Sequence, residues 1–109
     1  MDKYIVKITP QAHSDMLEIF RYVSNVLKER STAAKLLDKI ETSINSLDIM
    51  PHRIPLVKEE PWRSQGIHIM PIQNFLIYFW INENLKEVHI IAVIYGKRDQ
   101  FELLKQIDI

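Results

Sequence analysis

The stretch Met50-Pro-His-Arg-Ile-Pro-Leu-Val-Lys-Glu-Glu-Pro-Trp62 separates two halves of the chain that have different hydrophobic patterns. Its recurring prolines exclude a regular helix and a central strand, because proline lacks the backbone donor and fixes φ. Before this stretch, apolar residues recur at helical spacing. After it, they alternate or run on continuously, as in β-strands. The switch predicts a helical first half, a crossing loop and a sheet built mostly from the second half.

Two amphipathic helices are expected before the loop. Residues 10–29 place Met16, Ile19, Phe20, Val23 and Leu27 on one stripe, after Thr9 as N-cap and Pro10 at the first helical position. Residues 32–48 carry a second apolar stripe, which includes Ile40. The link between the helices is so short that they must be antiparallel neighbours.

Period-two and continuously apolar runs predict the sheet. Strands are expected over residues 3–8, 64–72, 75–81 and 87–95. Asp99, followed three residues later by Glu102, resembles a capping box and predicts a short last helix. The element order is therefore β-α-α-β-β-β-α. The expected class is α+β: an antiparallel sheet of about four strands with a helical hairpin on one face, in a single domain over residues 1–109.

Composition excludes several classes of protein. Fourteen Lys and Arg balance fourteen Asp and Glu, so no net positive charge favours strong sequence-independent binding of nucleic acid. The absence of Cys excludes disulfides and thiolate chemistry. No apolar run approaches the roughly 20 residues that span a bilayer, and the N-terminus does not read as a signal peptide. We expect a cytoplasmic protein without a membrane partner.

Several side chains are candidates for metal-free cleavage of RNA, which requires a base, cations at the phosphate and an acid. They are Arg63, His68, Tyr78, His89, Tyr95, Lys97 and Arg98. His89 and Tyr95 are six residues apart, which places them on one face of a strand and about 20 Å from each other. We therefore expect that they do not share a phosphate.

Each candidate also has a structural interpretation. Arg63 could stack on Trp62 or pair with a neighbouring glutamate, and Arg98 could pair with Asp99. Tyr95 could belong to the core. His13 and His52 have no evident partner. No two histidines stand at metal-ligand spacing, so neither a metal nor a cofactor is expected.

Four stretches, taken in order, resemble the RelE/ParE superfamily of toxins from type II toxin–antitoxin systems, which are also described as plasmid stabilisation toxins. They are Tyr4-Ile-Val-Lys-Ile-Thr-Pro-Gln-Ala12, Leu36–Leu47 with Met50-Pro51, Asn74-Phe-Leu-Ile-Tyr-Phe79, and Ile94-Tyr-Gly-Lys-Arg-Asp99. The resemblance spans nearly the whole chain. Each motif is weak alone, and together they are more specific for the superfamily than for a branch within it.

The resemblance implies a toxin that inhibits growth and is held inactive by a cognate antitoxin whose tail orders on binding. Free strand edges would invite such a tail to add a strand. One branch resembles ribosome-dependent mRNA endonucleases (mRNA interferases), whose partners are the ribosome and mRNA. Another resembles non-enzymatic inhibitors of DNA gyrase. A non-toxic protein-interaction module is a third alternative.

Matching the nuclease branch assigns catalytic roles to Arg63, Tyr95, Lys97 and Arg98, and ribosome-dependent mRNA cleavage is the expected activity. If the strand after Arg63 ran antiparallel to the last strand, Arg63 and Arg98 would converge on one anionic site. Two features depart from the nuclease branch: the zero net charge, and the two long helices followed by the proline-rich loop. The helices and the loop look more like the gyrase-inhibiting branch.

Overall fold

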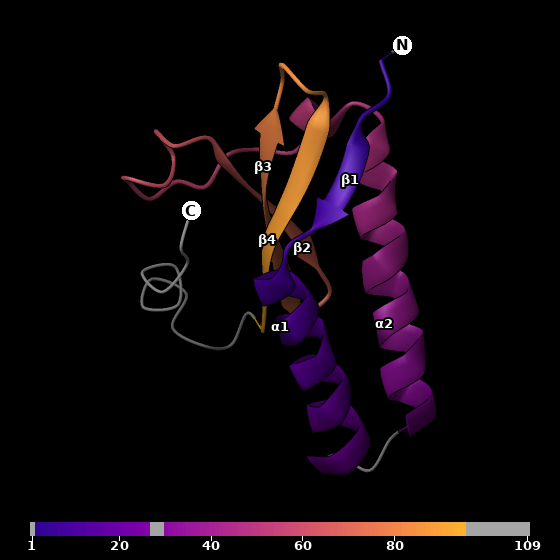
Figure 1. Ribbon diagram of the computed structural model, residues 1–109. Coiled ribbons are helices and arrows are strands. Elements are labelled where there is room, and N and C mark those ends of the chain that lie inside the picture. The colour runs from indigo at the N-terminus through magenta and orange to yellow at the C-terminus, as the bar shows by residue number, and fades with distance from the viewer. Residues whose placement is uncertain (1, 27–29, 96–109) are drawn as a thin grey trace.

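A four-stranded sheet with two helices on one face makes up the computed structural model, which describes residues 2–26 and 30–95 (Figure 1). The strands are β1 (Ile5–Ile8), β2 (Ile67–Ile72), β3 (Phe75–Asn82) and β4 (Glu87–Tyr95), and they lie in the order β1-β4-β3-β2. The helices are α1 (Pro10–Arg21) and α2 (Arg30–Asn45). The predicted α+β class is confirmed, as are the helical hairpin and the four strands.

The sheet is mixed, whereas an antiparallel sheet was expected. β2, β3 and β4 form an antiparallel meander, but β1 pairs with β4 in parallel, with Ile5 opposite Glu87 and Ile8 opposite Ile90. Tight turns force the three consecutive strands to be antiparallel. β1 is joined to the meander only through both helices and the long loop, so nothing local in the sequence fixes its direction.

The first helix begins as the sequence predicts. Thr9 is the N-cap, with its hydroxyl accepting from the backbone N–H of Ala12, and Pro10 is the first helical residue. After Arg21 the chain continues as a π-helical turn over Tyr22–Val26. α2 ends in a 3₁₀ turn over Ser46–Asp48, which matches the expected end near residue 48.

One carboxylate fastens α1 to the sheet. β1 ends opposite Ile90, and none of the strands that the structure describes lies beside the edge of β4 beyond that residue. Asp15 of α1 accepts a hydrogen bond there from the backbone N–H of Val93, at 3.0 Å. The N–H of Val93, which none of the described strands pairs, is therefore satisfied by a helix side chain.

Each face of the sheet has its own core. Between the sheet and the helices lie Met16, Ile40, Ile44, Leu47, Ile77, Phe79 and Ile90, among others. On the other face, a segment of residues 55–66, which we call the strap, covers part of the sheet. Its side chains Val57 and Trp62 pack there with Ile67, Tyr78 and Ile91. The loop predicted between the helices and the sheet is therefore an ordered cover, not a simple connection.

A β-bulge interrupts the pairing of β3 with β4. Tyr78 lies opposite Ala92 and Phe79 opposite Ile90, which leaves Ile91 as an extra residue in β4. An extra residue reverses which face the following side chains occupy. Ile91 packs on the strap side of the sheet. Unbroken alternation would put Val93 and Tyr95 on that side too, but both pack on the helix side.

The short last helix, expected after Asp99, lies outside the described residues. Within residues 2–26 and 30–95, none of the helices has both the length and the apolar character needed to cross a bilayer.

Candidate functional site

Arg63 belongs to the strap and precedes β2. Its guanidinium donates to the carbonyl oxygen of Val57 at 3.2 Å, and its backbone N–H donates to the carbonyl of Glu59 at 2.9 Å. The guanidinium therefore joins two parts of the strap by binding the carbonyl oxygen of Val57. One interpretation of the sequence had paired it with a neighbouring glutamate instead. Arg63 thus stabilises the fold of the strap just before β2 begins.

Tyr95 is the last residue of β4 and lies opposite Phe75. The two rings pack with centroids 5.3 Å apart, against the helix-side core. The interpretation of Tyr95 as a packing residue thus has direct geometric support. Lys97 and Arg98, the other two candidates, lie outside the described residues.

The structure does not bring Arg63 and Tyr95 together. β2 and β4 are both antiparallel to β3, so they run in the same direction. The start of β2 therefore lies level with the start of β4, and Tyr95 lies at the opposite end, about 20 Å away at the usual rise per residue. The assumption that the strand after Arg63 runs antiparallel to the last strand is wrong. It was the basis for expecting Arg63 to converge with the end of β4.

His89 and Tyr95 lie on opposite faces of the sheet, so the prediction that they share a face is wrong. The bulge at Ile91 stands between them and reverses the alternation. His89 packs beside Trp80 on the strap side, with ring centroids 5.3 Å apart, and contacts Glu87 at 3.1 Å. Glu87 also holds Lys7 at 2.8 Å, so its carboxylate serves two donors.

His68 lies on the helix face of β2. Its ring stacks on Phe79 with centroids 4.9 Å apart, and its Nδ1 lies 2.8 Å from the carbonyl oxygen of Ile54. Burial lowers the pKa of His68, which keeps the imidazole neutral at pH 7. A neutral ring stacked in the core is well placed for packing and poorly placed for proton exchange with a substrate.

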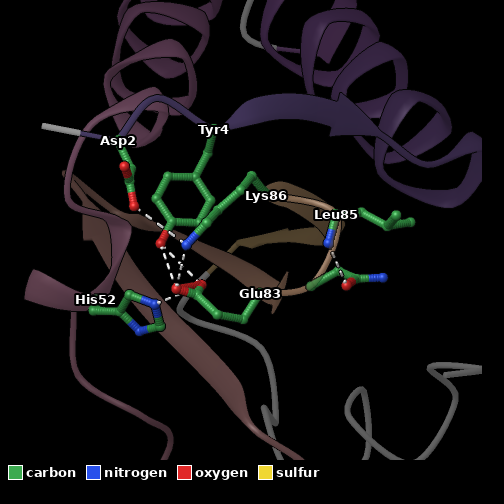
Figure 2. Close-up of polar contacts among 7 residues, drawn as sticks. Asp2, Tyr4, His52, Glu83, Leu85 and Lys86 are labelled. Carbon is green, nitrogen blue, oxygen red and sulfur yellow. Dashed lines mark hydrogen bonds and ion pairs between the residues drawn. The ribbon is translucent and has the colours of Figure 1, made fainter.

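A cluster of polar side chains surrounds the carboxylate of Glu83, at the end of the sheet where β1 begins (Figure 2). Tyr4 donates its hydroxyl to both carboxylate oxygens, at 2.8 and 2.9 Å. Lys86 lies 2.9 Å from one oxygen and His52 3.3 Å from the other. Asp2 completes the cluster through Lys86, at 3.3 Å. His52, for which the sequence offered no partner, is held by Glu83.

The charges of this cluster are already satisfied. Hydrogen bonds from Lys86 and its neighbours lower the pKa of Glu83 to about 2. The bond to Glu83 raises the pKa of Tyr4 and is the main cause of that shift. A carboxylate with so low a pKa is a poor general base at pH 7, and a phenol bound to it is a poor acid. The cluster is therefore suited to joining segments, not to transferring protons.

A pocket of about 430 Å³ lies beside the cluster and is lined by Asp2, Tyr4, Met50, His52 and Arg53. The guanidinium of Arg53 donates hydrogen bonds to the carbonyl oxygens of Ile49 and Met50 and to the hydroxyl of Ser46. Among residues 2–26 and 30–95, no three His, Asp or Glu side chains converge in a way that could hold a metal ion.

Comparison with known proteins decides the family. The sequence model of the ParE toxin of the type II toxin–antitoxin system parDE matches residues 6–100. The chain belongs to the ParE toxin family. A search of curated proteins found no match.

Solved structures share the fold of this ParE-family toxin at low sequence identity. A chain of the chromosomal ParDE system from P. aeruginosa superimposes with a TM-score of 0.72 at 19% identity, covering 87% of this chain and 98% of that chain. A chain of the toxin–antitoxin complex RelBE2 from Mycobacterium tuberculosis gives 0.61 at 18% identity, covering 87% and 93%. A mutant of the E. coli toxin RelE in the free state gives 0.59 at 11%, covering 97% and 99%. The RelE/ParE resemblance is confirmed.

Tyr78 is the other notable polar residue of the toxin. Its side chain is buried under the strap, and its hydroxyl has no hydrogen-bond partner among the described residues. Burial, reinforced by nearby Glu59, raises the pKa of this hydroxyl to about 12. A buried hydroxyl without a partner costs stability, which identifies Tyr78 as a position to test.

Proposed function

We propose that this toxin arrests growth by binding a protein target, DNA gyrase, as the non-enzymatic branch of the superfamily does. The observation that carries the proposal is the separation of Arg63 from Tyr95 at opposite ends of the sheet. Metal-free cleavage requires its base, cations and acid at one phosphate. The described candidates do not meet that requirement.

The face of the sheet under the strap adds support. Val57 and Trp62 cover Ile67 and Tyr78 there, which leaves an apolar core where a phosphate would need cations. Arg63, which follows Trp62 in the sequence, already donates to a carbonyl of the strap. The match to the ParE toxin family points to the same branch.

A cognate antitoxin is the second part of the proposal. The ParDE and RelBE2 structures that share this fold are toxin–antitoxin systems. We expect the neighbouring gene to encode a small protein that neutralises the toxin. Cells expressing the chain alone should stop growing, and co-expression of that protein should restore growth. Healthy growth in both cases would favour the non-toxic interaction module.

Two assays with the purified toxin separate the mechanisms. In a gyrase supercoiling assay, we expect inhibition that the antitoxin reverses. In a translation extract, we expect no new 5′ ends on a reporter mRNA. Arg63→Ala is the matched variant, and it should still inhibit gyrase because Arg63 is bonded within the strap. Ribosome-dependent cutting of the mRNA, lost in Arg63→Ala, would overturn the proposal in favour of an mRNA interferase.

A further inference from the structure

The strap begins by pairing with the outer edge of β2. Val57 donates to the carbonyl of Ile67 at 2.8 Å, and Ile69 donates to the carbonyl of Pro55 at 3.1 Å. The residue of β2 between these two bonds is His68. His68 therefore lies where the strap joins the sheet.

The side chain of His68 adds a further link at this point. Its Nδ1 lies 2.8 Å from the carbonyl oxygen of Ile54, the residue just before the strap. Because a carbonyl oxygen only accepts hydrogen bonds, Nδ1 carries the proton in this contact. The ring also stacks on Phe79 of β3, and His68 is only 8% exposed. His68 thus ties the segment that leads into the strap to two strands of the sheet.

A second proton on the ring of His68 would have no counter-charge beside it. The ring contacts Ile54, Phe79 and His52, and none of these groups carries a negative charge. His52 faces it from the 3₁₀ turn Pro51–Arg53, with the two ring centroids 6.2 Å apart. A charged imidazole at His68 would therefore be buried without a partner, which is unfavourable.

The charged groups of this region lie beyond His52 and are bound to one another. His52 contacts the carboxylate of Glu83 at 3.3 Å. That carboxylate also binds the other members of its cluster, Tyr4 and Lys86, and Lys86 binds Asp2 (Figure 2). A proton taken up by His52 would be stabilised by Glu83 and would repel a proton on His68. The cluster therefore provides no compensation for a charge on the buried ring.

The closed strap also carries a cost on the opposite face of the sheet. Val57 and Trp62 pack over Tyr78, whose hydroxyl is buried and has no hydrogen-bond partner among the described residues. If the strap opened, water could bind this hydroxyl, which partly offsets the loss of apolar packing. The strap is therefore the part of the sheet's cover that we expect to open at the lowest cost.

We propose that His68 makes the strap an acid-sensitive switch: a proton on its buried ring favours a form in which residues 54–57 have left the edge of β2. This inference goes beyond the proposed function, because neither gyrase nor an antitoxin takes part in it. Opening exposes the imidazole to water, where it can carry its charge, and uncovers the apolar face beneath Val57 and Trp62.

The direction of the effect follows from proton linkage. Burial lowers the pKa of His68 from its ordinary value of 6.5, so below pH 6.5 the open form binds more protons than the closed form. The open population therefore rises as the pH falls. If the closed form stays neutral, the open population at pH 5 is about thirtyfold that at pH 7.5. Carboxylates with ordinary pKa values titrate mainly below this range.

Residue-resolved amide hydrogen exchange of the full chain at pH 7.5 and pH 5, corrected for the intrinsic rate at each pH, tests the proposal. The amides of Val57 and Ile69, which form the bonds between strap and β2, should lose protection by tenfold to about thirtyfold at pH 5. The amides that join β3 to β4 should keep theirs. A loss of less than twofold at Val57 and Ile69 would overturn the proposal, and so would an equal loss throughout the sheet.

Two variants identify the histidine that is responsible. Asparagine at position 68 keeps an N–H donor near the position of Nδ1 but cannot take up a proton, so His68→Asn should abolish the pH dependence at Val57 and Ile69. His52→Gln is the matched control, since it keeps a donor for Glu83 and removes the other ring of the pair. It should retain the acid-induced loss of protection. The reverse result, with the effect lost in His52→Gln and kept in His68→Asn, would overturn the proposal.

The imidazole signals of the parent chain supply a readout that does not depend on the folding of either variant. In a nuclear magnetic resonance titration, the ring of His68 in the closed form should remain neutral at pH values where an exposed histidine is half protonated. If His68 instead takes up its proton near pH 6.5 while Val57 and Ile69 stay protected, the buried ring tolerates the charge and the switch does not exist.

Discussion

Replacing Ile40 by Asp tests where the helical hairpin meets the sheet. Ile40 lies on α2, is fully buried and belongs to the core between helices and sheet. Removing a buried aliphatic side chain of this size costs about 2–5 kcal/mol. Burying a carboxylate without a partner adds several kcal/mol more. Domains of this size are stable by about 5–15 kcal/mol in total. We therefore expect Ile40→Asp to be largely unfolded at pH 7.

Thr42→Asp is the matched control, because it makes the same charge change at an exposed position of the same helix. A surface substitution of this kind usually changes stability by less than about 0.5 kcal/mol, or a few degrees in melting temperature. Thermal unfolding followed by circular dichroism at pH 7 compares the two variants with the parent. If Ile40→Asp melts within a few degrees of Thr42→Asp, the assigned core face of α2 is wrong.

Three further substitutions probe single polar groups. Since the pKa of Glu83 is lowered from 4.5 to about 2, its stabilisation is present above pH 4.5 and lost as the pH falls toward 2. The deficit of Glu83→Gln in melting temperature should therefore shrink over that range, and a deficit independent of pH would contradict this. Tyr78→Phe removes a buried hydroxyl without a described partner, so it should leave stability unchanged or raise it by about 1 kcal/mol; a clear loss in denaturant titration would mean that the hydroxyl is bonded. Arg63→Ala should lower stability by about 1 kcal/mol through its contact with Val57 and preserve growth arrest; loss of toxicity with an unchanged melt would restore Arg63 to a catalytic site.

The elements of this fold could be predicted because their signals are local. Thr9 and Pro10 mark the start of α1 through capping chemistry, and the stripe that contains Ile40 marks the buried face of α2. The direction of β1 could not be predicted. A period of two shows which side chains share a face, but it does not show which neighbour a strand has or which way it runs.

The contacts of the candidate site depended on information that the sequence does not carry. One extra residue in β4, Ile91, moved His89 and Tyr95 to opposite faces, and nothing in a run of β-branched residues indicates where a bulge falls. The bond from Tyr4 to Glu83 joins residues 79 positions apart. Tyr4 reads as one more apolar residue of an alternating strand, so its hydroxyl gave no indication of a partner.

The Glu83 cluster fixes the beginning of the short strand β1. Tyr4 precedes β1 directly and is fixed twice, through its hydroxyl to Glu83 and through its backbone N–H to Asp48. At the other end, Thr9 donates both its N–H and its hydroxyl to the carbonyl of Ile90. A short strand held at both ends keeps little backbone freedom, and fixing the backbone is the main entropic cost of ordering a chain. The polar cluster, which has little capacity for proton transfer, thus has a physical role in fixing the start of β1 against the turn that precedes β4.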